Sequence, residues 1–279
     1  METLAENTFK KLSELAYALT GINVSSEKKG LIEHKLRKVL REYQLSSFEE
    51  LYEKMIADGD KYLVQTFIDR VSTNFTYFFR EPDHYEALYR DILPSLTKSL
   101  LQDNDYLRIW SAGCSSGEEP YTIAMVIHDT ITNHKTHLTY KILATDISER
   151  MLKKAIKGEY PYDDLKNVSK YWKEKYFKKT KDGYLHINHV VKDNIVFRKL
   201  NLKNKHFPFK RKFHIIFCRN VLIYFDRPTR INILHNLQKH LQIGGYLFLG
   251  HSEFDSYLYN YFTKVGRSIY KKHREEKYE

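Results

Sequence analysis

The sequence has few cysteines, glycines and prolines and no long apolar run. It holds 2 Cys, 11 Gly and 6 Pro among 279 residues. Two cysteines, Cys114 and Cys218, exclude a disulfide scaffold and a four-cysteine zinc site. The best apolar runs, 123–127 and 215–218, are far shorter than the roughly 18 residues that a membrane helix needs. Because the first residues also lack the pattern of a signal peptide, we expect a soluble, cytoplasmic protein without membrane insertion.

Aromatic residues and positive charge are abundant instead. The 22 Tyr and 16 Phe, within a hydrophobic fraction of 42%, argue for packed structure, in one large or two unequal domains. The formal net charge is +11, and the first 70 residues, with 11 basic and 12 acidic side chains, contribute none of the excess. A positive surface attracts nucleic acid, anionic lipid or an acidic protein. A lysine-rich surface that is merely solvated fits the charge equally well.

The first 72 residues read as an all-helical domain. Apolar residues recur at three- and four-residue steps, and no strand-like alternation interrupts them. Gly21 is a stop signal after the first helix, and Ser47 with Glu50 is a capping box for the third. The pattern predicts helices over residues 9–19, 31–40, 48–57 and 60–71.

From residue 106 onward, short apolar runs alternate with helical stretches, after a linker and a lid helix in 73–105. Strands are predicted over 107–110, 140–144, 213–218, 246–249 and 268–270, with helices over 118–129, 149–157 and 229–241. This alternation is typical of a mostly parallel α/β sheet with helices on both faces, here spanning 106–279. Residues 271–279 look like a frayed, charged tail.

One segment, 160–200, interrupts the alternation. Its Asp182-Gly183 pair is a hairpin signal, and residues 184–191 and 194–197 read as short β pieces. We interpret the segment as a small β insertion on the edge of the sheet domain.

The sharpest local signal is the turn between the strand at 107–110 and the helix that follows it. Gly113 and Gly117 allow a sharp turn and a close approach to a ligand, at the sheet edge where nucleotides bind. The turn lacks the motifs of dinucleotide and phosphate-binding loops. Glu118 and Glu119 would repel phosphate but suit S-adenosylmethionine, which carries a sulfonium and an ammonium and no phosphate. The alternative role for this acidic pair is compensation of the helix dipole.

Three other polar groups are expected at the same edge. Asp146 ends the second strand and can accept ribose hydroxyls, although an acid there is often only a helix cap. Arg219 and Asn220 follow the strand at 213–218, with Tyr224 one turn further on. Arg80 lies with polar neighbours at the domain junction, where an interdomain salt bridge is the alternative to a site role.

Five motifs in order resemble the chemotaxis-receptor glutamate methyltransferases, the CheR family, over nearly the whole chain. They are Asn74-Phe-Thr-Tyr-Phe-Phe-Arg80-Glu, Ala112-Gly-Cys-Ser-Ser-Gly-Glu-Glu-Pro-Tyr121, Ala144-Thr-Asp146-Ile, Cys218-Arg-Asn-Val-Leu-Ile-Tyr-Phe225 and Leu249-Gly-His-Ser-Glu253. The resemblance implies a Rossmann-like, class I S-adenosylmethionine-dependent methyltransferase domain behind the helical domain. It also implies S-adenosylmethionine as methyl donor, with S-adenosylhomocysteine as product.

The resemblance further implies a protein-glutamate O-methyltransferase that acts on cytoplasmic helices of methyl-accepting chemotaxis receptors. Arg80 and Tyr224 would be catalytic. The predicted cofactor contacts, with Gly113 added from the turn itself, are Asn74, Thr76, Arg80, Gly113, Glu118, Asp146, Asn201, Leu202, Arg219 and Asn220. Because a glutamate side chain is already ionised at neutral pH, the reaction needs positioning rather than a strong base.

The positive charge then has a candidate partner. The basic residues expected to dock on the acidic receptor helix are Lys35, Arg37, Lys38 and Arg41, although a solvated helix face is the plain alternative. We expect the protein to be a monomer. We also expect no metal site, because the 13 His show none of the sequence spacings that are typical of metal ligands. Which receptor and which glutamates are modified, and whether the insertion holds a receptor C-terminal pentapeptide, stay open.

Two other functions compete with this one. A nucleic-acid base methyltransferase usually needs an Asn/Asp-Pro-Pro-aromatic turn, but the corresponding place holds Cys218-Arg-Asn-Val221. A catalytically silent protein that only binds S-adenosylmethionine would not need Arg80 and Tyr224, and both are present.

Overall fold

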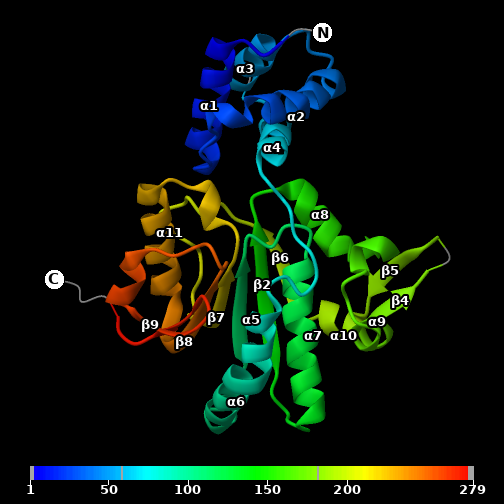
Figure 1. Ribbon diagram of the computed structural model, residues 1–279, viewed down its shortest axis with the longest axis vertical. Helices are drawn as coiled ribbons and strands as arrows, with labels where there is room; N and C mark the ends of the chain where they lie inside the picture. The colour runs from blue at the N-terminus through cyan, green and yellow to red at the C-terminus, as the bar shows by residue number, and fades with distance from the viewer. Residues whose placement is uncertain (1–2, 58, 181, 276–279) are drawn as a thin grey trace.

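A helical domain caps one edge of an α/β domain in the computed structural model (Figure 1), which describes residues 3–57, 59–180 and 182–275. The N-terminal helices are α1 (Glu6–Thr20), α2 (Lys29–Glu42), α3 (Phe48–Ala57) and α4 (Lys61–Val71). Their apolar faces meet in a separate core that includes the fully buried Leu36, Leu51 and Leu63. All four predicted helices are present.

Local signals explain where these helices begin and end. Gly21, with φ of 79°, ends α1 in the left-handed conformation that glycine adopts without steric cost. The side chain of Asp60 caps α4 by accepting hydrogen bonds from the backbone N–H groups of Tyr62 and Leu63. The capping box of α3 forms only in part, because Glu50 accepts from Ser46 rather than from Ser47.

The segment between the domains continues as α5 (Pro82–Ala87), a π-helical turn (Leu88–Ile92) and α6 (Leu93–Gln102). Leu88 and Leu93 are buried in the core of the α/β domain. This helical stretch is therefore part of that domain's packing, and its action as a lid stays a prediction.

The main sheet has seven strands in the order β6-β2-β1-β7-β8-β10-β9. The bounds are β1 (Leu107–Ala112), β2 (Tyr140–Asp146), β6 (Ile195–Lys199), β7 (Phe213–Cys218), β8 (Leu241–Leu249), β9 (Phe262–Gly266) and β10 (Ile269–Lys272). Neighbours from β6 to β8 pair in parallel, and β10 is antiparallel to both β8 and β9. The predicted α/β class is confirmed.

Helices cover both faces of this sheet (Figure 1). They include α7 (Glu118–Asn133), α8 (Glu149–Lys157) and α11 (Arg227–His240). Parallel strands buried on both faces read as continuous apolar runs, and every residue of β7 is buried. Within the described part of the chain, none of the helices has the length and apolarity that crossing a membrane requires.

The insertion is smaller than predicted. Its own sheet has the order β3-β5-β4, from β3 (Glu159–Pro161), β4 (Phe177–Lys179) and β5 (Tyr184–Ile187). The predicted hairpin joins β4 and β5, with Gly183 at φ of 83°. It also carries α9 (Lys170–Tyr176) and α10 (His189–Lys192), so residues 189–191 are helical and not β. The predicted piece at 194–197 belongs elsewhere, because β6 pairs with β2 and forms the edge of the main sheet.

The predicted frayed tail begins too early in the sequence. Lys271 and Lys272 lie in β10, and Lys272 is 1% exposed. Its Nζ donates hydrogen bonds to the carbonyl oxygens of Gln238 and Leu241, at 2.8 and 2.7 Å. A lysine that satisfies the last carbonyls of a helix can be buried, which composition alone does not reveal.

Candidate active site

A cavity opens where the helical domain meets the carboxyl edge of the main sheet. The space inside it is about 880 Å³ when the open solvent at its mouth is included. Of the predicted site residues, those that line it are Asn74, Thr76, Arg80, Gly113, Asp146, Asn201, Leu202, Arg219, Asn220 and Tyr224. Glu118 is not in the lining. The carboxyl ends of neighbouring parallel strands meet at one edge, which is why residues so far apart in the chain converge here.

The turn after β1 depends on close backbone packing. Gly113 has φ of 85°, and a Cβ at this position would lie 2.4 Å from Cγ2 of Val221. Gly117, with φ of 99°, is the N-cap of α7. A side chain at position 113 would therefore collide with the loop that follows β7, so the glycine keeps the two loops in contact.

Asp146 ends β2 in the wall of the cavity and is 8% exposed. Its Oδ2 accepts a hydrogen bond from Ser115 N at 2.8 Å, and its Oδ1 accepts one from Ser148 N at 2.9 Å. Burial raises the pKa of this carboxyl group, and the backbone hydrogen bonds oppose the rise. The backbone N–H groups of Ser115, Ile147 and Ser148 use most of its roughly four acceptor positions, which leaves room for a further donor such as a ribose hydroxyl. The cap of α8 is Ser148, whose Oγ accepts from Met151 N.

The two carboxylates at the start of α7 lie in different places. Glu119 lines the cavity, where its Oε1 accepts a hydrogen bond from Ser111 Oγ at 2.7 Å. Glu118 is buried outside the lining, accepts from Ser116 Oγ at 2.8 and 2.9 Å, and has its pKa raised to about 7 by burial. The assignment of Glu118 to the cofactor came from the resemblance and stays a prediction, whereas Glu119 is the member of the pair that lines the cavity. Successive helical residues point about 100° apart, so only one of the pair faces the cavity.

Arg219, directly after β7, is fixed in the cavity wall. It forms ion pairs with Glu81 at 3.1 Å and Glu119 at 3.2 Å, and its Nη1 donates to the hydroxyl of Tyr85 at 2.8 Å. Burial acts to lower the pKa of the guanidinium, but Tyr85 and the two carboxylates hold it above its ordinary value. Arg219 therefore neutralises the buried Glu119 and the half-buried Glu81 as well as lining the cavity.

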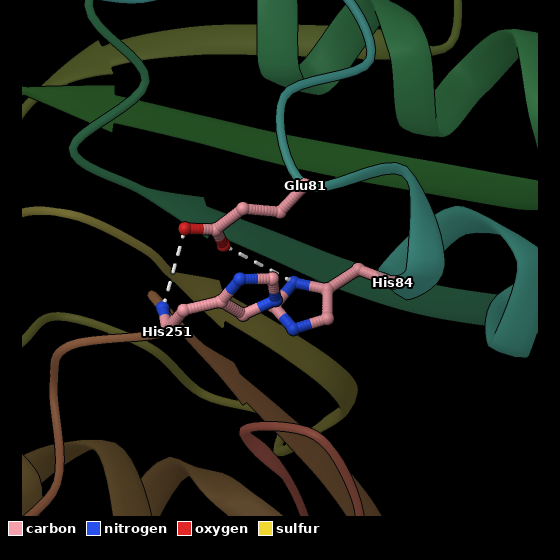
Figure 2. Close-up of side chains that lie close together, drawn as sticks. All are labelled: Glu81, His84 and His251. Carbon is pink, nitrogen blue, oxygen red and sulfur yellow. Dashed lines mark hydrogen bonds and ion pairs between the residues drawn. The ribbon is translucent and has the colours of Figure 1, made fainter.

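Three potential metal ligands, Glu81, His84 and His251, lie together (Figure 2), with one ligand atom of each within 4.8 Å of the others. Both oxygens of Glu81 already accept hydrogen bonds. Oε1 accepts from Asn220 Nδ2 and from His251 N, each at 3.2 Å, and Oε2 accepts from Arg219. Since the carboxylate has its acceptor positions filled, the cluster anchors Glu81, and the absence of a metal stays a prediction.

Arg80 and Tyr224, the predicted catalytic pair, both line the cavity. The guanidinium of Arg80 lies 5.6 Å from the ring centroid of Phe75 and donates to the Phe75 carbonyl at 2.9 Å. Burial raises the pKa of the Tyr224 hydroxyl, while a hydrogen bond with Thr73 and the positive charge of Arg80 oppose the rise. The two side chains are therefore close enough for the charge of one to act on the other.

The helical domain contributes part of the cavity wall, which sequence patterns did not suggest. Asn201 Nδ2 donates to the carbonyl of Leu19 at 2.7 Å, which ties the loop after β6 to the end of α1. Ile22 forms an isolated antiparallel bridge with Phe225. As a result Thr20 and Ile22 line the cavity, although neither belongs to a recognisable motif.

The predicted docking residues lie on α2: Lys35, Arg37, Lys38 and Arg41. Lys38 and Arg41 are exposed. Arg37 is half-buried and pairs with Glu33. Lys35 is also half-buried, its Nζ donates to the carbonyl of Ser72 at 3.3 Å, and burial lowers its pKa. The exposed part of this face is therefore smaller than the sequence suggested.

The fold and the cavity place the protein among the S-adenosylmethionine-dependent methyltransferases, since residues 74–270 match the domain described as "CheR methyltransferase, SAM binding domain". Residues 7–72 match "CheR methyltransferase, all-alpha domain". The chain belongs to the CheR methyltransferase family.

Curated relatives match along most of the chain. The chemotaxis protein methyltransferase of Borreliella burgdorferi is 42% identical over 251 residues, 90% of this chain and 89% of that protein. That of Escherichia coli is 33% identical over 270 residues, 96% of this chain and 91% of that protein. Chemotaxis protein methyltransferase 2 of Pseudomonas aeruginosa is 32% identical over 265 residues, 94% of this chain and 91% of that protein.

Proposed function

We propose that the protein is a cytoplasmic protein-glutamate O-methyltransferase for sensory adaptation. It methylates glutamate side chains on the cytoplasmic helices of methyl-accepting chemotaxis receptors and forms γ-carboxyl methyl esters. The observation that carries the proposal is one cavity with buried carboxylates in its wall and Arg80 and Tyr224 in its lining, in a chain of this family.

The cavity wall suits a methyl donor that combines a ribose with positive charge. Asp146 offers carboxylate lone pairs to ribose hydroxyls, and Glu119 offers a carboxylate to the cationic part. Asn74, Asn201 and Asn220 supply amide groups around them. S-adenosylmethionine bound here supplies an electrophilic methyl group on its sulfonium.

The acceptor chemistry needs orientation more than proton transfer. A carboxylate oxygen forms a bond to the methyl carbon as the carbon–sulfur bond breaks, and S-adenosylhomocysteine leaves. We assign Arg80 and Tyr224 to hold the acceptor carboxylate by hydrogen bonds and to direct one oxygen at the methyl group. Orientation of this kind contributes roughly 7–11 kcal/mol to catalysis. Arg80 must not stabilise the ionised ground state more than the transition state, because that would slow the transfer.

The 3₁₀ turn Ser26–Lys28 and the helix α2 that follows it bring positive charge toward the cavity. The Nζ of Lys28 lies 5.9 Å from the ring centroid of Tyr224, and Lys35 reaches Ser72, which also lines the cavity. Lys38 and Arg41 extend this charge outward along α2. An acidic receptor helix laid along α2 would therefore present a glutamate near Tyr224 while its other acids meet basic side chains.

Reversing the charge of the exposed part of α2 tests this docking. The double variant Lys38→Glu/Arg41→Glu is expected to raise KM for receptor by about tenfold at low salt, because rim charges act mainly on association, while the affinity for S-adenosylhomocysteine stays unchanged. Lys98→Glu, on α6 at the opposite end of the molecule (Figure 1), is the matched control. If the double variant methylates receptor as wild type does at low salt, docking along α2 is wrong.

Transfer of a radiolabelled methyl group to receptor-containing membranes tests the function itself. We expect label in protein that is released by mild base, because a carboxyl methyl ester is base-labile. Label that appears in nucleic acid and survives base would instead identify a nucleic-acid methyltransferase. Binding of S-adenosylmethionine without any transfer would identify a protein that only binds it.

A further inference from the structure

Glu253, four residues after the end of β8, is a buried carboxylate with no role in the chemistry above. It is 3% exposed and does not line the cavity. Its two oxygens accept hydrogen bonds from four backbone N–H groups: Oε2 from Asn220 and Gly250 at 2.7 Å each, and Oε1 from Leu222 at 2.6 Å and Ile223 at 3.3 Å. Three of these donors lie between Arg219 and Tyr224, in the loop that carries both side chains into the cavity.

This loop cannot satisfy its own backbone. It leaves β7 at Cys218 and enters a 3₁₀ turn over Leu222–Tyr224, and the first N–H groups of a helical turn have no partner within it. Asn220 has φ of 58°, a conformation that L-residues seldom adopt. A carboxylate is the acceptor best suited to such a cluster, because each of its oxygens accepts two hydrogen bonds.

The loop that follows β8 and begins at Gly250 packs closely against the loop of residues 219–224. A Cβ at Gly250 would lie 2.5 Å from Nδ2 of Asn220 and 2.8 Å from its backbone nitrogen. Glu81 holds the same loop from the other side, since it accepts from the side chains of Asn220 and Arg219. The backbone of the loop is therefore fixed mainly by Glu253, and the side chains by Glu81.

We propose that Glu253 is a positioning residue for the methyl-transfer site. It sets the backbone of residues 219–224, so that Asn220 reaches the cofactor part of the cavity and Tyr224 the acceptor part. The inference for Tyr224 rests on the proposed function, whereas the inference for Asn220 requires only the cofactor site.

Glu253→Gln tests the role with little change of shape. The amide replaces one acceptor oxygen by a donor that opposes backbone N–H groups, so we expect S-adenosylhomocysteine to bind at least about tenfold more weakly by calorimetry. Glu253→Asp keeps the charge on a shorter side chain and is expected to recover part of this affinity. If both variants bind as wild type does, the proposal is wrong.

Asp255→Asn is the matched control for a general loss of stability. Asp255 is also buried, at 6% exposed, but its side chain caps the 3₁₀ turn over Ser256–Asn260 by accepting a hydrogen bond from Tyr257 N. This capping hydrogen bond does not involve the loop of residues 219–224. Both variants are expected to lower the melting temperature, and only Glu253→Gln is expected to weaken binding. Equal weakening by Asp255→Asn would show that Glu253 acts through stability alone.

A double-mutant cycle with Tyr224→Phe tests the acceptor part. We expect Tyr224→Phe to lower kcat at least about tenfold in wild type and clearly less in Glu253→Gln, since residues that act as a unit give non-additive effects. Additive effects on kcat would overturn positioning of Tyr224 by Glu253. If Tyr224→Phe has no effect in wild type, the proposed role of Tyr224 is what fails, and the calorimetry still decides the role of Glu253.

Discussion

Arg80→Ala is expected to lower kcat by about 100-fold, the loss that misplacing a reacting group by about 1 Å can cause. Arg80 lines the cavity, is held against Phe75 and acts on the pKa of Tyr224, and the proposed role requires its guanidinium to meet the acceptor carboxylate there. The effect should appear in single-turnover methylation of receptor with saturating donor.

Two further variants separate this role from loss of charge in general. Arg80→Lys keeps the charge but not the planar fork of donors, so we expect only partial recovery of kcat. Arg90→Ala removes an exposed arginine that does not line the cavity and should leave kcat unchanged. If Arg80→Ala reduces only the affinity for S-adenosylhomocysteine and not kcat, Arg80 is a cofactor contact and not a catalytic residue.

Glu119→Gln is expected to weaken S-adenosylhomocysteine binding by about 10- to 100-fold, as lost hydrogen bonds to charged groups generally do. The carboxylate is buried in the cavity wall beside Arg219, and the low local dielectric of a buried position strengthens its interaction with a bound ammonium. Calorimetry with the purified variant measures the change directly, without any receptor.

Glu118→Gln is the natural partner experiment, because the two acids are adjacent in the same helical turn. Glu118 lies outside the cavity lining and has its pKa raised to about 7 by burial, so its amide is expected to bind S-adenosylhomocysteine within about twofold of wild type. The reverse pattern, a large effect at Glu118 and none at Glu119, would restore the assignment that the family resemblance suggested.

Local sequence signals predicted most of the secondary structure. The nearly continuous apolar run of β7 and the helix stop at Gly21 are decided by neighbouring residues, and the structure places both as expected. The edge strand β6 was assigned to the insertion because its short β pattern does not say which sheet it joins. Its parallel pairing with β2 depends on residues about 50 positions earlier in the chain.

Some residues of the candidate site were likewise predicted from local sequence, and others were not. The loop after β1 and the acid after β2 were found from sequence because a strand, a turn and a polar residue are consecutive there. Glu81 and Glu253 were missed because their partners around Asn220 lie 139 and 33 residues away. A glutamate at the end of a family motif gives no signal of the distant groups that it will meet in the fold.

By itself the sequence determined the helical and α/β parts, the turn at Gly113 and the polar residues at the strand ends, because each follows from short-range periodicity and steric limits. Only the tertiary structure decided that Glu119 rather than Glu118 lines the cavity, that α1 forms part of its wall, and that Lys272 is buried. Those outcomes depend on the rotation of a packed helix and on which backbone groups are left to be satisfied. Both are set by contacts between segments that are distant in the chain.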